Sequence, residues 1–473
     1  MQRVLTALLL SFLIGGCALA ADGPDAWPWW RGPEFNGVAR GDAPLTWSDQ
    51  DHIAWRVPVP GKGHSSPVIW GDRLFLTTAA PTGNAPAAAP AEAPAPPPPP
   101  GPPGQGGPGG PPGRGAFGGR GGPPGGPGDR RGGYGGGNAP QSEQKLLVLA
   151  YDRKTGKQLW EKTAIVTTPH EGYHQQYGSF ASPSVLVDSK HVIAYFGSRG
   201  LYCYTHEGQP VWQKDFGIKL RMIMAFGEGS SPALDGDKLV VLLDHEGDSF
   251  LVALDKNTGR ELWRTPRPPG STWSSPLIIT VAGKKQVLVS ATKFVAGYDL
   301  ETGKLLWQTT GLGRNVIPMP VVADGVAYVM SGYQAPNLLA IRLGKEGDLT
   351  GTDAILWQNQ RGNSYTPSPV LYQGKLYVLT DTGTLSCFDA KTGKAFYSQQ
   401  RLPKSYSFKS SPVAANGKLY MATEDGDVVV VKMGEKFEVL ATNTLADQVF
   451  IATPAIMDGA IYLRGQNTLF CVR

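Results

Sequence analysis

Short runs of alternating apolar and polar residues recur along the chain, separated by turns rich in glycine, asparagine and aspartate. The clearest copy covers residues 231–263 and predicts strands at 238–244 and 250–255, with a last strand ending at Trp263. The turns between them, such as Asn257-Thr258-Gly259, carry residues that reach positive φ at low cost, as hairpins require. Four short strands in a repeat of ~40–50 residues are typical of one blade of a β-propeller.

An X-Pro pair marks the start of each copy. It occurs at Pro67, Pro183, Pro232, Pro276, Pro320, Pro369, Pro412 and Pro454. A closing aromatic or apolar residue follows at Trp160, Trp212, Trp263, Trp307, Trp357, Tyr397 and Leu440. The last copy stops before its fourth strand, and residues 52–57, with Trp55, read as the missing one. The pattern therefore predicts an all-β fold over 52–473: eight four-stranded antiparallel blades, the last closed by an N-terminal strand, which leaves no long unpaired edge.

The first 20 residues have the pattern of an export signal. Arg3 precedes an apolar run at 4–14 that is too short to span a bilayer, and small residues follow it. Ordinary cleavage after Ala20 is favoured, and a lipobox-like stretch ending in a lipidated Cys17 is the alternative. Either route predicts a periplasmic or extracellular protein, with membrane attachment at the outer membrane only if Cys17 is lipidated. Residues 21–51, which include the sequence WPWWRGP at 27–33, are expected to form a strap that packs against the propeller wall.

Residues 79–141 are rich in proline, glycine and alanine and interrupt the first blade between its second and third strands. This composition cannot build a core, so the insertion is expected to be disordered or polyproline-like. Binding a partner, tethering to an envelope polymer and having no specific role all stay open for it.

Charge and cysteine content add little specificity. The formal net charge is +5, which offers no argument for nucleic-acid binding. Cys203, Cys387 and Cys471 each fall in the third strand of a blade, where other blades have small residues. Since no two of these blades are adjacent, we expect packing cysteines and no disulfide.

The chemically varied loops all belong to one face, formed by the loops between second and third strands and by the crossovers to the next blade. Loops of this kind on a rigid scaffold usually carry the binding function. The candidate ligand-binding residues on this loop-rich face are His64, His170, His174, Arg221, Asp244, His245, Trp273, Arg314, Tyr365 and Lys409. Cations mixed with aromatic side chains fit a small anionic or aromatic ligand near the central channel, or an envelope protein as partner. A solvated rim is the plain alternative.

Two local motifs point to metals only weakly. The sequence His170-Glu171-Gly172-Tyr173-His174 spells H-E-x-x-H, which binds zinc when a helix places both histidines on one face. Here Pro169 and Gly172 argue against a helix, so a metalloprotease is disfavoured. The loop at 244–248 has several oxygen donors but lacks the spacing of a calcium loop. No catalytic or metal-binding residue is assigned.

The repeats resemble the pyrroloquinoline-quinone (PQQ)-like propeller repeat, as in Gly374-Lys375-Leu376-Tyr377-Val378 followed by Asp389-Ala390-Lys391-Thr392-Gly393-Lys394. With WPWWRGP and the run at 195–203, the chain is similar to secreted bacterial PQQ-like propellers and to BamB, the outer-membrane assembly lipoprotein. The resemblance implies a non-enzymatic binding or assembly scaffold in the cell envelope, with no cofactor.

The alternative that the resemblance leaves open is a PQQ-dependent quinoprotein oxidoreductase similar to the alcohol dehydrogenases, with Ca2+ beside the PQQ. In that case Asp244 or Glu228 would act as the base. The chain departs from this enzyme branch, because it has neither a vicinal cysteine pair nor a C-x-x-C-H motif for covalent haem.

Overall fold

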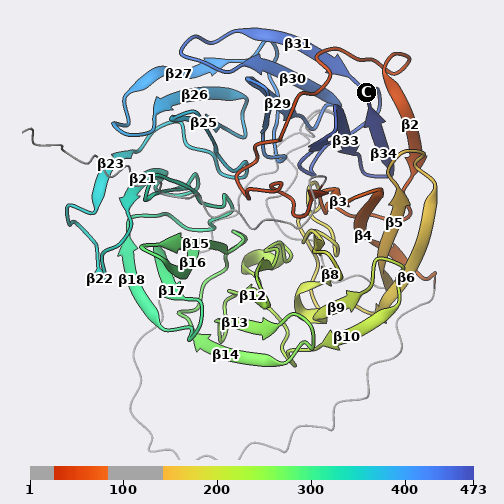
Figure 1. The fold of residues 1–473 in the computed structure, drawn as a ribbon, viewed down its shortest axis with the longest axis horizontal. Coiled ribbons are helices and arrows are strands. Elements are labelled where there is room, and N and C mark those ends of the chain that lie inside the picture. Colours follow the sequence, from red (N-terminus) through yellow and green to blue (C-terminus); the bar gives the residue numbers. More distant parts are fainter. Residues whose placement is uncertain (1–25, 84–141) are drawn as a thin grey trace, which may run out of the picture.

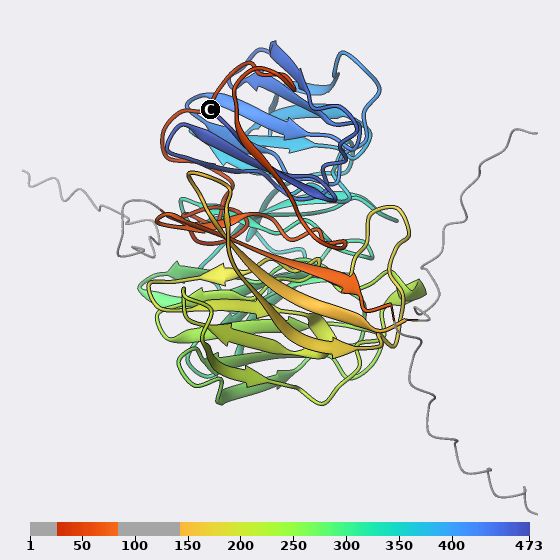
Figure 2. The same ribbon diagram turned by 90° about the vertical axis from the view of Figure 1, so that its right-hand side faces the viewer.

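The computed structural model describes residues 26–83 and 142–473. Eight antiparallel sheets stand around a central axis like the blades of a propeller (Figure 1). The predicted all-β, eight-bladed fold is confirmed. Figure 2 shows the same ring from the side, with the strands of each blade stacked from the axis outward.

The strands follow the chain from the inside of each blade to the outside. The first four blades are β3 (Val68–Trp70), β4 (Arg73–Pro81), β5 (Gln144–Asp152), β6 (Gln158–Thr167); β7 (Leu186–Val187), β8 (Val192–Tyr195), β9 (Leu201–Tyr204), β10 (Pro210–Lys214); β11 (Ala233–Asp235), β12 (Lys238–Leu243), β13 (Phe250–Asp255), β14 (Glu261–Pro266); and β15 (Leu277–Val281), β16 (Lys284–Ala291), β17 (Phe294–Asp299), β18 (Leu305–Thr310). Two 3-10 turns, η1 (Gly197–Arg199) and η2 (Ile223–Ala225), lie in loops.

The other four blades repeat this order. They are β19 (Val321–Ala323), β20 (Val326–Ser331), β21 (Asn337–Arg342), β23 (Ile355–Asn359); β24 (Val370–Tyr372), β25 (Lys375–Leu379), β26 (Thr384–Asp389), β27 (Ala395–Arg401); β28 (Val413–Ala415), β29 (Lys418–Ala422), β30 (Asp427–Lys432), β31 (Val439–Thr444); and β32 (Ala455–Met457), β33 (Ala460–Arg464), β34 (Thr468–Val472), β2 (Ile53–Pro58). The short β22 (Gly347–Asp348) pairs in parallel with β18.

The last blade is completed by the N-terminal strand β2, as predicted. β2 pairs antiparallel with β34, and Trp55 stands opposite Cys471. Figure 1 shows the red β2 beside the dark blue β34 on the outer edge of the ring. Because β2 covers the outer edge of β34, the last blade has four strands and its third strand is not left as an unpaired edge.

Outer-strand tryptophans join five of the eight blades to the next blade. Five indoles donate their Nε1–H to a backbone carbonyl of the following blade: Trp55 to Arg153, Trp160 to His206, Trp212 to Lys256, Trp263 to Leu300 and Trp357 to Ala390, at 2.7–3.0 Å. Within its own sheet each of these tryptophans faces a small residue, for example Ala253 opposite Trp263. The shared feature of these turns is a glycine, for example Gly156, Gly259 and Gly393, against which the preceding blade's indole packs.

The small slot in the third strand explains the cysteines. Cys203 faces Trp212, Cys387 faces Tyr397 and Cys471 faces Trp55. All three are buried free thiols, as expected. The seventh blade departs from the predicted closing residue: Ala441, and not Leu440, stands opposite Val430, because there the larger side chain lies on the third strand.

A belt of hydroxyl groups lines the axis where the inner strands begin. The backbone N–H of a belt residue in one blade donates to the side-chain oxygen of the belt residue in the next, at 2.9–3.2 Å. The belt residues are Ser66, Ser184, Ser231, Ser275, Met319, Ser368, Ser411 and Thr453. Only Met319 lacks a hydroxyl, so the belt is interrupted once. In the other blades the belt residue directly precedes the proline of the X-Pro pair. In the second blade it is Ser184, which follows Pro183, so the prediction that this blade starts at Pro183 is wrong by two residues.

The first part of the strap crosses the inner ends of several blades and does not lie along the propeller wall, contrary to prediction. β1 (Ala26–Trp27) pairs with β3 of the first blade, Trp29 donates to the Pro232 carbonyl of the third, and the Arg31 guanidinium donates to the Pro369 and Pro412 carbonyls of the sixth and seventh. Figure 1 shows this red segment passing through the middle of the ring. The reason is that the free carbonyls at the starts of the inner strands are acceptors available near the axis. The last part of the strap does reach the wall, where the Trp47 N–H donates to the Asn443 side chain of the outer strand β31 at 2.8 Å.

The boundary of the proline-rich insertion lies later than predicted. β4 continues to Pro81, because Ala79 and Ala80 still pair with Leu146 and Lys145. Most of 79–141, the export signal and Cys17 lie outside the described residues. Within the described part of the chain, no helix is long and apolar enough to span a membrane.

Candidate functional site

A funnel opens at the centre of the loop-rich face, with a cavity of about 140 Å3. Successive crossovers contribute its walls, so residues far apart in the sequence converge at the axis. The residues that line it are His174, Tyr177, Gly178, Ser182, Phe226, Gly227, Glu228, Gly229, Trp273, Ile317, Tyr365 and Thr366. A cavity of ~150 Å3 holds one benzene molecule, so the funnel is the size of a single aromatic ring.

The funnel residues obey a positional rule. Ser182, Gly229, Trp273, Ile317 and Thr366 each stand two positions before the belt residue of their blade. The same position holds His64, Lys409 and Ile451 in the remaining blades. Since the belt fixes the depth of each crossover, the residue two positions earlier turns toward the axis at one common level.

Aromatic side chains dominate the wall, and several are fixed by further contacts. The His174 and Tyr177 rings stack with centroids 3.6 Å apart. Trp273 donates its Nε1–H to the Gly227 carbonyl at 2.7 Å, and Tyr365 packs on Tyr333 at 5.4 Å. These contacts hold the rings in place, so the cavity is preformed.

Lys409 holds the same position in its blade but is not among the residues that line the funnel. Its Nζ lies 4.8 Å from the Tyr177 ring centroid and 3.6 Å from a carboxylate oxygen of Glu424. The cation is therefore compensated by Glu424 and by the ring face. Among the described residues that line the funnel there is no lysine or arginine.

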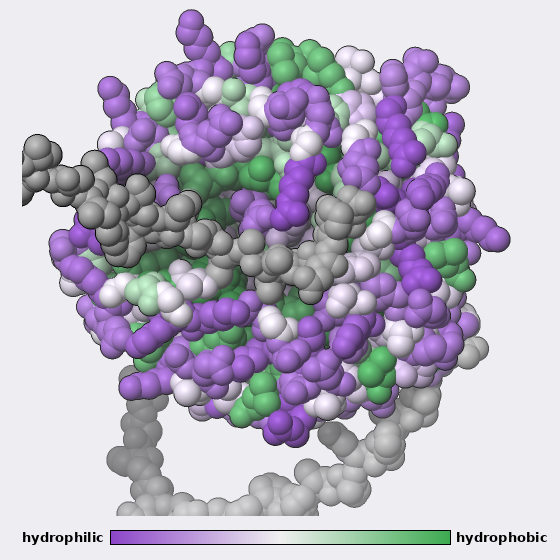
Figure 3. Space-filling view, in the orientation of Figure 1, coloured by the Kyte–Doolittle hydropathy of each residue, from purple (hydrophilic) through white to green (hydrophobic). Residues whose placement is uncertain are grey.

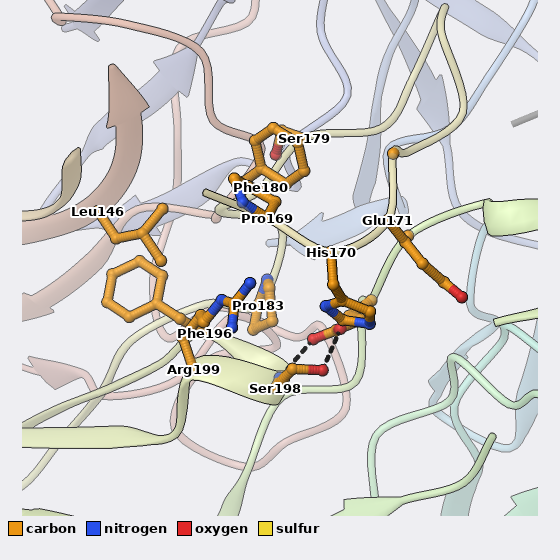
Figure 4. Close-up of a pocket in the computed structure, with 13 residues that line it drawn as sticks. Leu146, Pro169, His170, Glu171, Ser179, Phe180, Pro183, Phe196, Ser198 and Arg199 are labelled. Atoms are coloured by element: carbon orange, nitrogen blue, oxygen red, sulfur yellow. Dashed lines mark hydrogen bonds between the residues drawn. The ribbon is translucent and has the colours of Figure 1, made fainter. Parts of the chain in front are cut away.

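Glu228 is the one carboxylate among those lining residues. It accepts the Ser198 backbone N–H and the Ser198 hydroxyl, both at 2.6 Å, as drawn by the dashed lines in Figure 4. Burial raises the pKa of Glu228 to about 7, and the Ser198 hydrogen bonds oppose that shift. A side chain at Gly197, where φ is +55°, would collide with the Glu228 carboxylate, so glycine is required there.

Glu228 also borders a smaller pocket of about 40 Å3 with His170 and Arg199. His170 Nε2 lies 2.8 Å from the Leu220 carbonyl, and burial lowers its pKa. The Glu171 carboxylate instead accepts the Met222 N–H at 3.1 Å. Figure 4 shows Glu171 pointing away from the other side chains of the pocket.

The H-E-x-x-H sequence forms a loop and not a helix. His170 lies in the small pocket, whereas His174 lies in the funnel wall, so the two rings do not share a helical face. Within 26–83 and 142–473, no group of three or more His, Cys, Asp or Glu residues could hold a metal ion. The loop's histidines serve packing and hydrogen bonding.

Asp244 is engaged in a buried ion pair. Both of its carboxylate oxygens accept hydrogen bonds from Arg267, at 2.7 and 2.9 Å, and the two side chains are 2% and 0% exposed. Arg267 also donates to the Tyr298 hydroxyl. Burial opposes the charge on Arg267, but the Asp244 carboxylate outweighs it and raises the arginine pKa. Asp244 is therefore held in the third and fourth blades rather than offered to a ligand.

The remaining predicted residues do not reach the funnel wall. His245 accepts the Arg221 N–H at 3.2 Å, and the Arg221 guanidinium donates to the Glu246 carbonyl, which ties a crossover to the neighbouring loop. Arg314 is exposed. His64 is buried, and burial with the nearby Arg464 and Lys62 lowers its pKa to about 3, so its ring is neutral.

The residues present do not fit a calcium-bound PQQ. PQQ is a tricarboxylate with fused rings, whereas the funnel has the volume of one ring, presents a carboxylate and has no cation among its described lining residues. Asp244, one of the two bases considered, is neutralised by Arg267. We therefore derive no step through this cofactor.

Three of the predicted ligand-binding residues, His174, Trp273 and Tyr365, line the funnel. Glu228, considered as a base under the quinoprotein alternative, lines it too, and other funnel residues were missed. Tyr177, Phe226 and Ile317 were not singled out, although the position two residues before each belt residue would have identified Ile317. Tyr177 and Phe226 lie earlier in their crossovers, and only the folded loops bring them to the axis.

Fold and site together define a propeller with a preformed cavity of aromatic character on the axis of the loop-rich face. The family model described as outer membrane protein assembly factor BamB matches residues 144–351 and 345–436, more than half of the chain. The chain therefore belongs to the BamB family of PQQ-like propellers, and the predicted resemblance is confirmed.

Two curated relatives illustrate the range of the similarity. The outer membrane protein assembly factor BamB of Yersinia pestis is 25% identical over 283 residues, which cover 55% of this chain and 63% of that protein. A 1-butanol dehydrogenase (quinone) of Thauera butanivorans is 28% identical over 190 residues, 39% of this chain and 28% of that protein. The chain thus spans less than two thirds of the length of either relative.

Solved structures share the fold at low identity. BamB of Moraxella catarrhalis matches with a TM-score of 0.50 and 14% identity, covering 69% of this chain and 90% of that one. A europium-containing methanol dehydrogenase matches with a TM-score of 0.59 and 11% identity, covering 95% and 91%. At this level of identity the matches establish the architecture and leave the activity open.

Proposed function

We propose that this protein is an exported, non-enzymatic binding scaffold of the cell envelope that recognises a partner protein through its loop-rich face. The observation that carries the proposal is the funnel: a preformed aromatic cavity of about 140 Å3 without a lysine or arginine among its described lining residues. Such a cavity accepts one aromatic or aliphatic side chain of a partner, the kind of anchor that dominates protein interfaces.

Family membership supports a scaffold role. The matched family model and the Yersinia pestis relative are both described as outer membrane protein assembly factors. From that description we propose that the partner of this chain is a protein of outer-membrane assembly. Export through the signal at 1–20, and attachment through Cys17 if it is lipidated, complete the proposed envelope location.

The alternative, a PQQ-dependent oxidoreductase, draws support from the quinone-dependent relative and from the propeller fold of the dehydrogenases. The chemistry of the funnel disfavours it, since three ligand carboxylates would meet Glu228 and no lining cation. Calorimetric titration of the mature protein with PQQ, with and without Ca2+, separates the two functions. Tight binding followed by dye-linked alcohol oxidation would overturn the scaffold proposal.

A site-specific crosslinking experiment tests the scaffold function directly. A photoreactive residue at Ile317 in the funnel should form a discrete adduct with an envelope protein, and the Trp273→Ala substitution should remove it. A photoreactive residue at Lys391, in an exposed turn between third and fourth strands, is the matched control and should give none. Equal adducts at both positions, or an adduct indifferent to Trp273→Ala, would contradict recognition through the funnel.

A further inference from the structure

A second, larger cavity lies beside the funnel, at the root of the interrupted first blade. It has a volume of about 640 Å3. We call it the root groove, and its walls include Lys62, Pro81, Ser142, Gln144, Tyr173 and Phe180. They come from the segment before β3, the end of β4, the start of β5 and the crossover to the second blade. The groove is separate from the funnel, since no residue lines both.

The root groove presents flat aromatic surface with polar groups close by. The Tyr173 and Phe180 rings meet edge to face with centroids 4.7 Å apart, and Lys62 Nζ lies 4.8 Å from the Tyr173 centroid. Gln144, whose amide nitrogen lies 3.1 Å from the Ser142 hydroxyl, adds a hydrogen-bonding side chain at the edge. Aromatic-lined grooves with such donors recognise polyproline II segments, whose rings pack on the aromatic faces and whose carbonyls accept hydrogen bonds.

The chain itself carries a segment of this chemistry, joined to the groove at both ends. Residues 84–141 lie in the sequence between Gly83 and Ser142. Ser142 lines the groove, and so does Pro81, two residues before Gly83. Within the stretch 84–141, residues 94–104 read PAPPPPPGPPG and carry no charge. The nearest charged residues of the stretch, Glu92 and Arg114, lie outside this run.

Distance along the chain favours contact in cis. Twelve residues separate Gly83 from Pro96, a length that can span at most ~40 Å. A tether of this length gives an effective concentration in the millimolar range. Even a weak polyproline contact is largely occupied under these conditions.

We propose that the root groove is a polyproline-binding site and that its occupant is the chain's own segment 94–104. This assignment does not depend on the proposed function of the funnel. It gives the proline-rich insertion a partner within the molecule, next to the crossover that also supplies His174 and Tyr177 to the funnel.

The test compares the binding of a synthetic peptide with the sequence of residues 94–104 to two forms of the full chain. One is the native chain. The other, called the proline-free chain, has every proline of 94–104 (Pro94, Pro96 to Pro100, Pro102 and Pro103) replaced by glycine, which keeps the loop length and removes the cis occupant. We expect the proline-free chain to bind the peptide at least tenfold more tightly than the native chain, because the native groove is already filled. Equal affinities, or no binding to the proline-free chain, would overturn the proposal.

The binding site is assigned with variants made in the proline-free background. Tyr173→Leu keeps apolar volume but removes the flat ring and should abolish peptide binding. Phe396→Ala, at an exposed aromatic residue on the outer strand β27, is the matched control and should leave the affinity unchanged. Thermal unfolding verifies that both variants are folded. Binding that survives Tyr173→Leu in a folded chain would exclude the root groove as the site.

Discussion

The backbone N–H of Thr453 in the last blade donates to the Oγ of Ser66 in the first, at 3.0 Å. This hydrogen bond joins residues 387 positions apart and completes the hydroxyl belt at the axis. On the rim, the pairing of β2 with β34 closes the same two blades. The ring is thus closed both at its inner and at its outer edge.

Removing the Ser66 hydroxyl should weaken this closure measurably. In Ser66→Ala the Thr453 N–H is left buried without its acceptor, which typically costs ~1–3 kcal/mol. Urea unfolding should show this loss of unfolding free energy. Ser398→Ala, on the exposed side of β27, is the control and should change stability by no more than ~0.5 kcal/mol. A similar effect at both serines would mean that the belt hydrogen bond does not stabilise the ring.

The tryptophan seats provide a second prediction, with a control in the same blade. Gly393 and Gly374 both have positive φ, +72° and +71°, but a Cβ at Gly393 would approach Trp357 Cδ2 to 2.6 Å, whereas a Cβ at Gly374 has open space around it. Gly393→Ala and Gly374→Ala therefore carry the same backbone strain, and only the first displaces the indole. We expect Gly393→Ala to be less stable than Gly374→Ala by ~1–3 kcal/mol, measured by urea unfolding. Equal losses would contradict a stabilising role for the docked indole.

Much of the fold could be predicted because each blade obeys local rules. Turn residues set the hairpins, and the small residue opposite Trp263 recurs at Cys203 and Cys387 for the same packing reason. The errors arose where local rules are ambiguous. Pro183 resembles the prolines that start the other blades, and by that rule Ser182 would be the belt residue. In the structure the belt residue is Ser184, two positions later.

The site was predicted less well, because it is built by convergence rather than by pattern. Asp244 and His174 are both titratable residues in loops of the same face, so the sequence offers no reason to separate them. In the structure Asp244 is paired with Arg267 in the core, whereas His174 lines the funnel at the axis. Arg31 shows the same limit: its sequence position gives no sign that it reaches two proline carbonyls on distant blades. Such partners depend on contacts hundreds of residues apart.

Burial of Glu228 predicts a stability that depends on pH. Its pKa is about 7 in the folded protein against 4.5 as the ordinary value, so between these values the folded state keeps a proton that the unfolded state releases. The free energy of unfolding therefore falls as pH rises through this window, by ~1–3 kcal/mol for this group. Unfolding of Glu228→Gln should show a flatter pH dependence, while the exposed Glu346→Gln should follow the native curve. A native slope that persists in Glu228→Gln would assign it to another group.

The last prediction concerns the Asp244–Arg267 ion pair. Removing one of the two charges should destabilise the fold more than removing both. Asp244→Asn leaves the Arg267 guanidinium, which is 0% exposed, without a counter-charge. Breaking a buried pair in this way typically costs ~3–5 kcal/mol. In the double variant Asp244→Leu/Arg267→Met no buried charge remains, so it should recover most of that loss. Urea unfolding of the native chain, of the single variants Asp244→Leu and Arg267→Met, and of the double variant measures the coupling. If the losses of the single variants simply add in the double variant, the pair does not act as a unit, and Asp244 would again become a candidate for ligand binding.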